Sequence, residues 1–299
     1  ADGAAPEDTS MHLLLYNQAV ALAQQEQHAS AASVLESLFR RIEPCDEWVA
    51  MRAAFLLLDV YARTFLGTQA EDNNLGLVTQ KARAVLQYLE QAHVFTDATA
   101  TAACIAAAMP ASTQGAEAGP LSSYAVAAGR MVVAHFTATL AVHRARLALC
   151  TDDVAGCMQH LKVVFDTCAG AGGAAASGDT GSAFSTTLPP ADGTDVGGVG
   201  AAPRDPTQPG WVQLHCTRQL ALSLRAEVAA RRRHFTRAVK LLGTCLAESE
   251  SVARKLGPLN VAGDRGLQVC QYLNNLGALQ GRQGNVAAAV LLFTKAVDA

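Results

Sequence analysis

The segment LNNLGALQGRQGNVAAAVLLFTKAV, residues 273–297, limits most strongly what this chain can fold into. Small and large residues alternate in it at regular helical spacings, and one glycine separates two stretches of strong helix formers. This pattern predicts two antiparallel helices that cross closely where the residues are small. The small residues are Gly277, Ala289 and Ala296, the large ones are Leu276 and Phe293, and the turn is at Gly284.

A single hairpin of this kind cannot bury its apolar face, so further hairpins are expected upstream. Four segments show the same arrangement, with small residues in their second helices at equivalent places: 13–44 (Ala31), 55–91 (Ala82), 140–165 (Gly156) and 224–248 (Ala238). The pattern is that of the tetratricopeptide (TPR) repeat. We therefore predict an all-α fold, a right-handed α-solenoid of irregular TPR hairpins with long low-complexity inserts, as one domain over residues 1–299.

The hairpins lie farther apart than the roughly 34 residues of a bare TPR repeat. The stretch GTQAEDNNLGLV, residues 67–78, lengthens the turn of the second hairpin. An insert over residues 91–122 has an alanine-rich part that favours a short helix. A second insert, residues 167–210, is rich in Gly, Ala, Ser, Thr and Pro and has few large apolar residues, so we predict that it is disordered.

Composition sets broad limits on function. Half of the residues are hydrophobic but only 5% are aromatic, which favours packed helices, and the net charge of −3 gives no general attraction to nucleic acid. The most apolar stretch, residues 124–149, contains Arg130, Arg144 and Arg146, so we expect a soluble protein. The chain begins with Ala1–Asp2, as a fragment or a processed product would.

Eight cysteines occur without a C-x-x-C pair, and most lie among apolar residues. We interpret them as buried thiols in a reducing compartment, which predicts a cytoplasmic and possibly also nuclear protein with no metal site.

The segment GAGGAA, residues 170–175, resembles a dinucleotide-binding turn, but a predicted helix precedes it where a strand is required. The histidines show no ligand spacing. We therefore expect no cofactor, no catalytic residues and no enzymatic activity.

Candidate partner-binding residues lie on the first helices of the hairpins, which line the concave groove of a TPR array. Superposing the hairpins places three arginines at one equivalent position, which would favour an acidic or phosphorylated partner segment. Two further residues share the same inner face. These groove candidates are Tyr16, Arg63, Arg231, Asn274 and Arg282.

The alternative interpretation of two of these arginines is local. Asp59 precedes Arg63 by four residues, and Glu227 precedes Arg231 by four, so both could form ordinary intrahelical ion pairs. The basic cluster Arg231–Arg237 spans a predicted turn, where exposed charges are common. Asn17 and Asn275 suggest the clamp with which some TPR co-chaperones hold a carboxylate, but its lysines are missing.

Four segments in this order carry a resemblance to a known family: YNQAVALAQQEQHASAASVLESLFRRIEP, FLLLDVYARTFL, RARLALCTDDVAGCMQHLKVVF and YLNNLGALQGRQGNVAAAVLLFTKAV. They resemble the TPR subunit, subunit ten, of the carbon catabolite repression–negative on TATA-less (CCR–NOT) mRNA deadenylase complex. The long inserts and the excess of alanine depart from that pattern and mark a divergent member.

This resemblance implies a non-enzymatic scaffold that binds a subunit-eleven homologue and, through it, the N-terminal region of the large NOT scaffold. It would support poly(A) shortening by other subunits. Two alternatives stay open: a generic TPR adaptor that recognises a peptide of an unrelated partner, and an enzyme hidden in an irregular helical fold. Direct RNA binding is not expected. The apolar segment VLLF, residues 290–293, predicts that further repeats or a bound partner cover the last hairpin.

Overall fold

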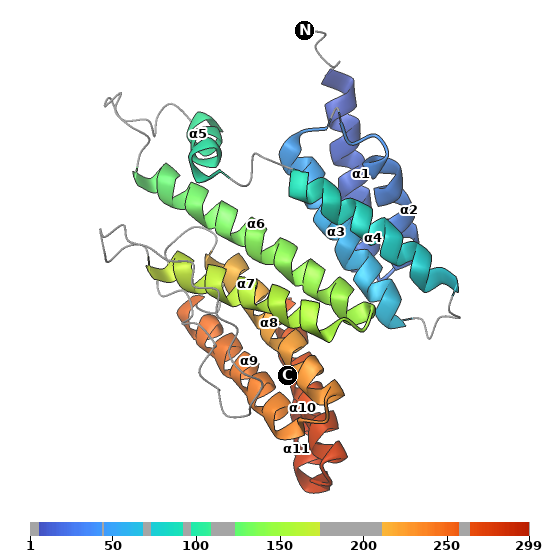
Figure 1. Ribbon diagram of the computed structural model, residues 1–299, viewed down its shortest axis with the longest axis vertical. Helices are drawn as coiled ribbons and strands as arrows, with labels where there is room; N and C mark the ends of the chain where they lie inside the picture. The colour runs from blue at the N-terminus through green and yellow to red at the C-terminus, as the bar shows by residue number, and fades with distance from the viewer. Residues whose placement is uncertain are drawn as a thin grey trace. The chain divides into compact units, whose positions relative to one another are not determined.

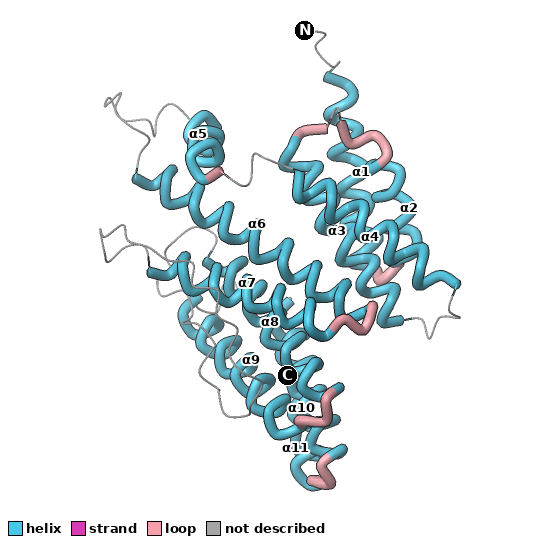
Figure 2. Tube along the Cα trace, in the orientation of Figure 1, coloured by secondary structure: helices cyan, strands magenta, loops and turns pink. Residues whose placement is uncertain are grey.

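The computed structural model describes residues 6–43, 45–67, 73–91, 97–108, 123–173, 211–256 and 264–298. Within these ranges every regular element is a helix, and Figure 2 shows no strand among them. The helices are α1 (Pro6–Gln24), α2 (His28–Phe39), α3 (Glu47–Gly67), α4 (Asn73–Gln91), α5 (Ala98–Ala108), α6 (Ser123–Cys150), α7 (Val154–Gly173), α8 (Trp211–Arg231), α9 (Phe235–Leu256), α10 (Asp264–Arg282) and α11 (Val286–Asp298). The predicted all-α fold is confirmed.

The chain divides into two compact units. The first comprises residues 1–93 and 143–153, and in it α2 lies between α1 and α3, while α3 contacts α4. The second comprises residues 94–142 and 154–299, and in it α7 contacts α8, α8 contacts α9, α9 contacts α10, and α10 contacts α11 (Figure 1). The single domain predicted over residues 1–299 stays a prediction.

One turn geometry recurs at four places in the described chain. The second residue after the first helix has a positive φ angle in each case, and the next residue donates its N–H to the carbonyl five residues earlier, as in the Schellman motif. The positive-φ residues are Glu26 (60°), Asp152 (59°), Arg233 (61°) and Gly284 (83°). The N–H of Asn285, for example, lies 2.9 Å from the carbonyl oxygen of Gln280. The turn predicted at Gly284 is confirmed.

The small residues also recur in register with these turns. Seven residues before each turn residue, the first helix has a buried alanine or glycine: Ala19, Ala145, Ala226 and Gly277. A Cβ atom on Gly277 would lie only 2.7 Å from Cε1 of Phe293, which confirms the predicted close crossing. The fourth residue of the second helix is likewise small and at most 4% exposed: Ala31, Cys157, Ala238 and Ala289.

The small residue predicted at Gly156 was therefore wrong by one position. The turn at Asp152 makes Val154 the first residue of α7, so its fourth residue is Cys157 and its third is Gly156. Cys157 is completely buried, whereas Gly156 is half-buried. Because consecutive helical residues point about 100° apart, a shift of one residue decides which side chain meets the neighbouring helix.

The predicted inserts are only partly described. The connection between α3 and α4 is longer than in the other hairpins, and α5 forms inside the 91–122 insert, as expected from its alanines. In the 167–210 insert, however, residues 167–173 are helical, because α7 continues to Gly173. Cys168 in this part is completely buried, and its Sγ lies 4.0 Å from the carbonyl oxygen of Leu214 on α8. The rest of that insert lies outside the described residues.

Among the described helices, residues Ala125–Cys150 of α6 are long and apolar enough to cross a membrane, judged by length and composition alone. The core helices of soluble proteins pass the same test, and 44% of the most apolar part of α6 is buried in the protein. Near its end, Arg144 and Arg146 form ion pairs with Glu90 and Asp59. Such partners are what the end of a helix acquires when it packs against other protein helices.

The close contact between α5 and α6 should reverse the usual effect of a glycine-to-alanine substitution on stability. Replacing glycine by alanine inside a helix normally stabilises it by about 0.5–1 kcal/mol. At Gly129 of α6, however, a Cβ atom would lie 2.7 Å from the backbone oxygen of Ala98 and 2.9 Å from Cβ of Ala102. We expect Gly129→Ala to separate α5 from α6 and to lower the free energy of unfolding by about 1–3 kcal/mol.

Gly243→Ala in α9 is the matched control, because nothing lies within 4 Å of its Cβ position. This variant should gain the usual helical stabilisation in urea unfolding followed by circular dichroism. Hydrogen exchange at the α5 amides should accelerate only in the Gly129 variant. If Gly129→Ala stabilised the protein as much as Gly243→Ala does, the close contact of α5 with α6 would be refuted.

Candidate interaction surfaces

The predicted groove residues all lie on the first helices of hairpins. In the first unit, Tyr16 on α1 is half-buried and Arg63 on α3 is exposed; in the second, Arg231, Asn274 and Arg282 are exposed on α8 and α10. The side chains are thus placed where a partner could reach most of them. Their role in partner binding stays a prediction.

Two ion pairs bear on the local interpretation of Arg63 and Arg231. Arg231 Nη2 lies 2.7 Å from Glu227 Oε1, as the local interpretation predicted. Asp59, by contrast, pairs with Arg146 of α6 and not with Arg63. Neither Arg63 nor Arg282 forms an ion pair with the part of the chain that the structure describes. These two arginines therefore remain available for an acidic group.

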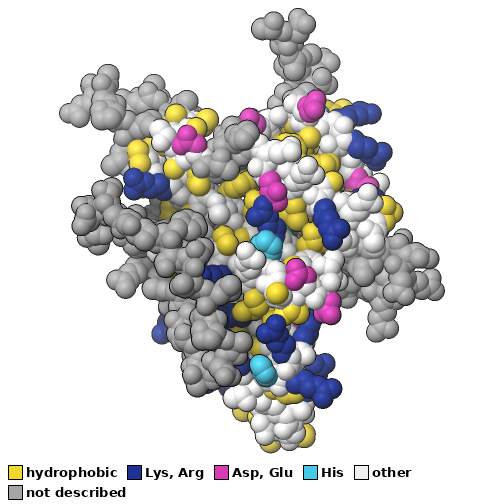
Figure 3. Space-filling model, viewed as in Figure 1, with side chains coloured by type: hydrophobic (Ala, Val, Ile, Leu, Met, Phe, Trp, Pro, Cys, Tyr) yellow, Lys and Arg dark blue, Asp and Glu magenta, His cyan; other side chains and the backbone are white. Residues whose placement is uncertain are grey.

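The wider charge pattern contains no extended basic surface on the face shown in Figure 3. Lysine and arginine side chains lie there in small groups among acidic and apolar ones.

A polar network connects three helices of the first unit. The Tyr61 hydroxyl on α3 donates a hydrogen bond to Glu36 Oε1 on α2 at 2.9 Å, and Lys81 Nζ on α4 lies 2.8 Å from the same oxygen. Burial alone would raise the pKa of Glu36, but the hydrogen bonds from Lys81 and Tyr61 outweigh it and lower that pKa. The carboxylate is thus a structural connection among α2, α3 and α4.

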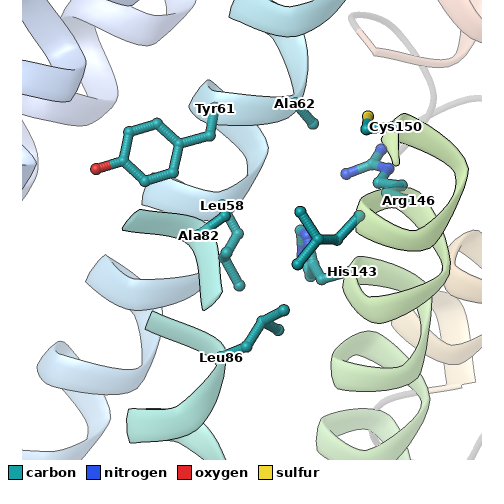
Figure 4. A pocket seen from close by; sticks show the side chains of 9 residues that line it. Leu58, Tyr61, Ala62, Ala82, Leu86, His143, Arg146 and Cys150 are labelled. Carbon is teal, nitrogen blue, oxygen red and sulfur yellow. The ribbon is translucent and has the colours of Figure 1, made fainter. Parts of the chain in front are cut away.

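A small cavity in the first unit lies between α3, α4 and the end of α6 (Figure 4). Its lining includes Leu58, Leu86, His143 and Arg146. Tyr61 also lines it, but the Tyr61 hydroxyl points away from His143 and Arg146. The volume of about 20 Å³ corresponds to roughly one water molecule. The cavity is too small for an organic substrate, so it is a packing feature.

His143, which lines this cavity, is a strongly perturbed titratable group. Its ring stacks on Phe55 with centroids 5.6 Å apart, and Nε2 lies 4.0 Å from Asp59 Oδ1. Burial lowers the pKa of His143 to about 4, even though Asp59 acts in the opposite direction. The imidazole is therefore neutral at pH 7, and in this environment it functions as a packed aromatic ring.

In the second unit a buried ion pair joins α8 to α9. Arg218 Nη2 lies 3.1 Å from Glu248 Oε1, and the two side chains are only 3% and 17% exposed. The guanidinium carbon of Arg218 is 5.7 Å from the centroid of the Phe165 ring on α7, and that of Arg225 is 5.6 Å from it. This arrangement fixes α7, α8 and α9 relative to one another through charge as well as packing.

The cysteines are more varied than predicted. Cys157, Cys168 and Cys245 are buried, as expected, but Cys104 and Cys216 are exposed and the other three are intermediate. Burial raises the pKa of both Cys168 and Cys245 to about 12, so these thiols are protonated and unreactive. Within the described ranges, no group of three or more His, Cys, Asp and Glu side chains is arranged to hold a metal ion.

Among the described residues of the second unit, most of the large apolar side chains that stay exposed lie on α11. Four residues spaced four, three and four apart form one face of the helix, which we call the α11 stripe: Val286, Val290, Phe293 and Val297, exposed by 65%, 58%, 39% and 86%. Leu291 is also exposed, by 57%, but it projects from a different face. The sequence had indicated this region only through residues 290–293.

Comparison with known proteins gives a partial relationship. Over 59 residues, 20% of this chain, the sequence is 46% identical to CCR4-NOT transcription complex subunit 10-B and 44% identical to subunit 10-A, both of Xenopus laevis. The match covers 8% of the length of either relative. No family model matches the chain. One fifth of this chain is thus similar in sequence to subunit 10 of this complex. The described part of this chain is built of repeated helical hairpins.

Sequence reasoning missed the buried Arg218–Glu248 pair and the contacts of Asp59. Arg218 and Glu248 lie on successive helices, 30 residues apart, and neither has an oppositely charged residue three or four positions away in its own helix. The available signal was the position of Arg218 four residues after Leu214 and four before Leu222, on the apolar face of α8, because burial of arginine normally requires a partner.

Proposed function

We propose that this chain is a non-enzymatic scaffold subunit of a CCR4–NOT type complex, in which other subunits shorten poly(A). The observation that carries this proposal is the 44–46% identity to subunit 10 over 59 residues, found in a chain built of repeated helical hairpins. Helical repeats offer large surfaces for protein partners. We further propose that the protein resides in the cytoplasm and the nucleus.

The partner would be a subunit-eleven homologue, and through it the N-terminal region of the large NOT scaffold. Co-expression of the three chains followed by size-exclusion chromatography tests this directly. A stable ternary complex that needs the subunit-eleven homologue would support the proposal. Migration of this chain apart from both others would contradict it.

The alternative function is a TPR adaptor that recognises an acidic peptide of an unrelated partner. Exposed Arg63 and Arg282 on first helices favour this function, because neither is neutralised by an ion pair with a described residue. An adaptor would bind isolated short peptides, whereas the scaffold subunit would require a folded partner with a large interface.

The groove hypothesis predicts a charge-dependent loss of binding. Arg282→Glu should weaken binding of the partner by about tenfold or more, because it replaces attraction to an acidic segment by repulsion. Arg237→Glu is the control, since Arg237 is an exposed arginine of the same unit that lies on the second helix α9. Isothermal titration calorimetry with the purified partner measures both. Equal effects of the two variants would remove the groove from the proposal.

A further inference from the structure

The turn between α8 and α9 carries a dense group of positive charges. Arg232, Arg233 and Arg237 are exposed and form no ion pair with any residue that the structure describes, whereas Arg231 pairs with Glu227. The whole chain has a net charge of −3, so this basic turn is a local exception. Several of its guanidinium groups are thus available to meet an acidic group.

A free hydroxyl lies within this group of arginines. Thr236, the second residue of α9, is exposed, and its side chain forms no hydrogen bond with the described ranges of the chain. Two other exposed threonines of the second unit differ from it, because Thr244 Oγ1 and Thr294 Oγ1 each donate a hydrogen bond to the carbonyl four residues earlier, both at 3.0 Å. A threonine at the start of a helix has no helical carbonyl four residues before it, so its hydroxyl stays available.

The arginines stand at particular spacings from this hydroxyl. Arg231 is five residues before Thr236, and Arg233 is three residues before it. No other serine or threonine in the described ranges has arginines at both of these positions. Protein kinases select their substrates partly by the pattern of charge around the acceptor, and kinase carboxylates can bind guanidinium groups at fixed spacings. The segment RRRHFT, residues 231–236, therefore has the pattern that an arginine-directed kinase recognises.

The segment is also accessible to such an enzyme, which binds its substrate in an extended form. Residues 232–234 lie outside the helices, so binding requires the last residue of α8 and the first residues of α9 to leave their helices. Helix ends open at low cost. Phe235 is only half-buried, and the first fully buried residue of α9, Ala238, lies beyond the acceptor. The core of the unit can thus stay folded while the turn opens.

We propose that Thr236 is a phosphorylation site for an arginine-directed protein kinase. The kinase would transfer the γ-phosphoryl group of ATP to Thr236 Oγ1. A new bond forms between this oxygen and phosphorus, the bond between phosphorus and ADP breaks, and the hydroxyl proton passes to a carboxylate of the kinase. This inference goes beyond the proposed function and does not depend on it.

The folded turn is suited to hold the phosphate once it is attached. The first turn of α9 contains no acidic residue, although the backbone N–H groups and the dipole of a helix favour negative charge at this end. Lys240 is exposed four residues after Thr236, which is the favourable order of an acidic and a basic group along a helix. Phosphorylation should therefore stabilise the beginning of α9 and reduce the positive charge of the turn.

Labelling with a purified kinase tests the site. The chain is incubated with ATP and protein kinase B, which selects arginines at these two spacings, and the labelled residues are mapped by mass spectrometry. We expect label on Thr236 but not on Thr244 or Thr294, which are exposed and lack these arginines. Arg233→Gln should slow the labelling of Thr236 by about tenfold or more, whereas Arg237→Gln, after the acceptor, should slow it by less than about threefold.

The stability of the phosphorylated chain tests whether the phosphate fits the folded turn. Phosphate on Thr236 should raise the Tm by about 1–3 °C and slow hydrogen exchange at the first amides of α9. Thr236→Ala, treated with the kinase in the same way, should show neither change. Three results would each overturn the inference: no label on Thr236, labelling that Arg233→Gln leaves unchanged, or phosphorylation of Thr236 that does not raise the Tm.

Discussion

Replacing Glu248 by alanine is expected to lower the free energy of unfolding by about 3–5 kcal/mol, because it leaves the Arg218 charge buried without its partner. The guanidinium is 3% exposed, and Nη2 and Nε both lie within 3.3 Å of Glu248 Oε1. The Phe165 ring 5.7 Å away offers some compensation through its π face, but far less than a carboxylate does. Urea unfolding followed by circular dichroism at pH 7 measures the loss.

Two controls isolate the cause of that loss. Glu227→Gln removes the acidic partner of Arg231, but both of those side chains are at least 40% exposed, so the change should cost less than about 1 kcal/mol. The double variant Arg218→Met with Glu248→Gln removes both charges and should recover most of the stability, since no charge stays buried. A double variant as unstable as Glu248→Ala would mean that packing, and not charge, sets the cost.

Acidification should destabilise the first unit through His143. In the unfolded chain this histidine gains a proton near its ordinary pKa of 6.5, whereas burial lowers the pKa in the folded protein to about 4. Between these pH values the unfolded state binds the proton and the folded state does not, so stability falls as the pH falls. The loss approaches about 3 kcal/mol near pH 4 and then levels off.

His143→Leu should remove this part of the pH dependence while keeping an apolar side chain against Phe55. Asp59 on α3 and Arg146 on α6 are the charged groups beside the imidazole, and both remain in the variant. The difference in the free energy of unfolding between wild type and variant, measured from pH 7.5 to pH 4, should grow steadily in favour of the variant below pH 6.5. A constant difference would show that His143 is protonated equally in both states.

Local chemistry was sufficient to predict the hairpins. Spacing of small and large residues in 273–297 placed the crossing at Gly277 and the turn at Gly284, and both are confirmed. The i,i+4 pair of Glu227 with Arg231 was foreseeable for the same reason, because residues four apart on a helix are always neighbours. Each of these features lies within one helix or one hairpin, so residues close together in the sequence specify its geometry.

Register within a helix was harder to predict, as the shift from Gly156 to Cys157 shows. Glycine is the usual residue for a close contact, so composition favoured Gly156. The beginning of α7 is set by the turn at Asp152, however, and that turn uses a non-glycine residue at positive φ. Asp152 gives a much weaker turn signal than Gly284 does, and a one-residue error about where a helix begins changes which side chain is buried.

The sequence by itself thus determined the class of fold, the hairpins and the apolar end of the last helix. Only the tertiary structure decided which charges meet and which apolar faces stay open. Asp59 had Arg63 four residues away but pairs with Arg146, which is 87 residues distant. The physical reason is that local pairs contribute only about 0.2–0.5 kcal/mol, so a partner brought close by helix packing readily replaces them.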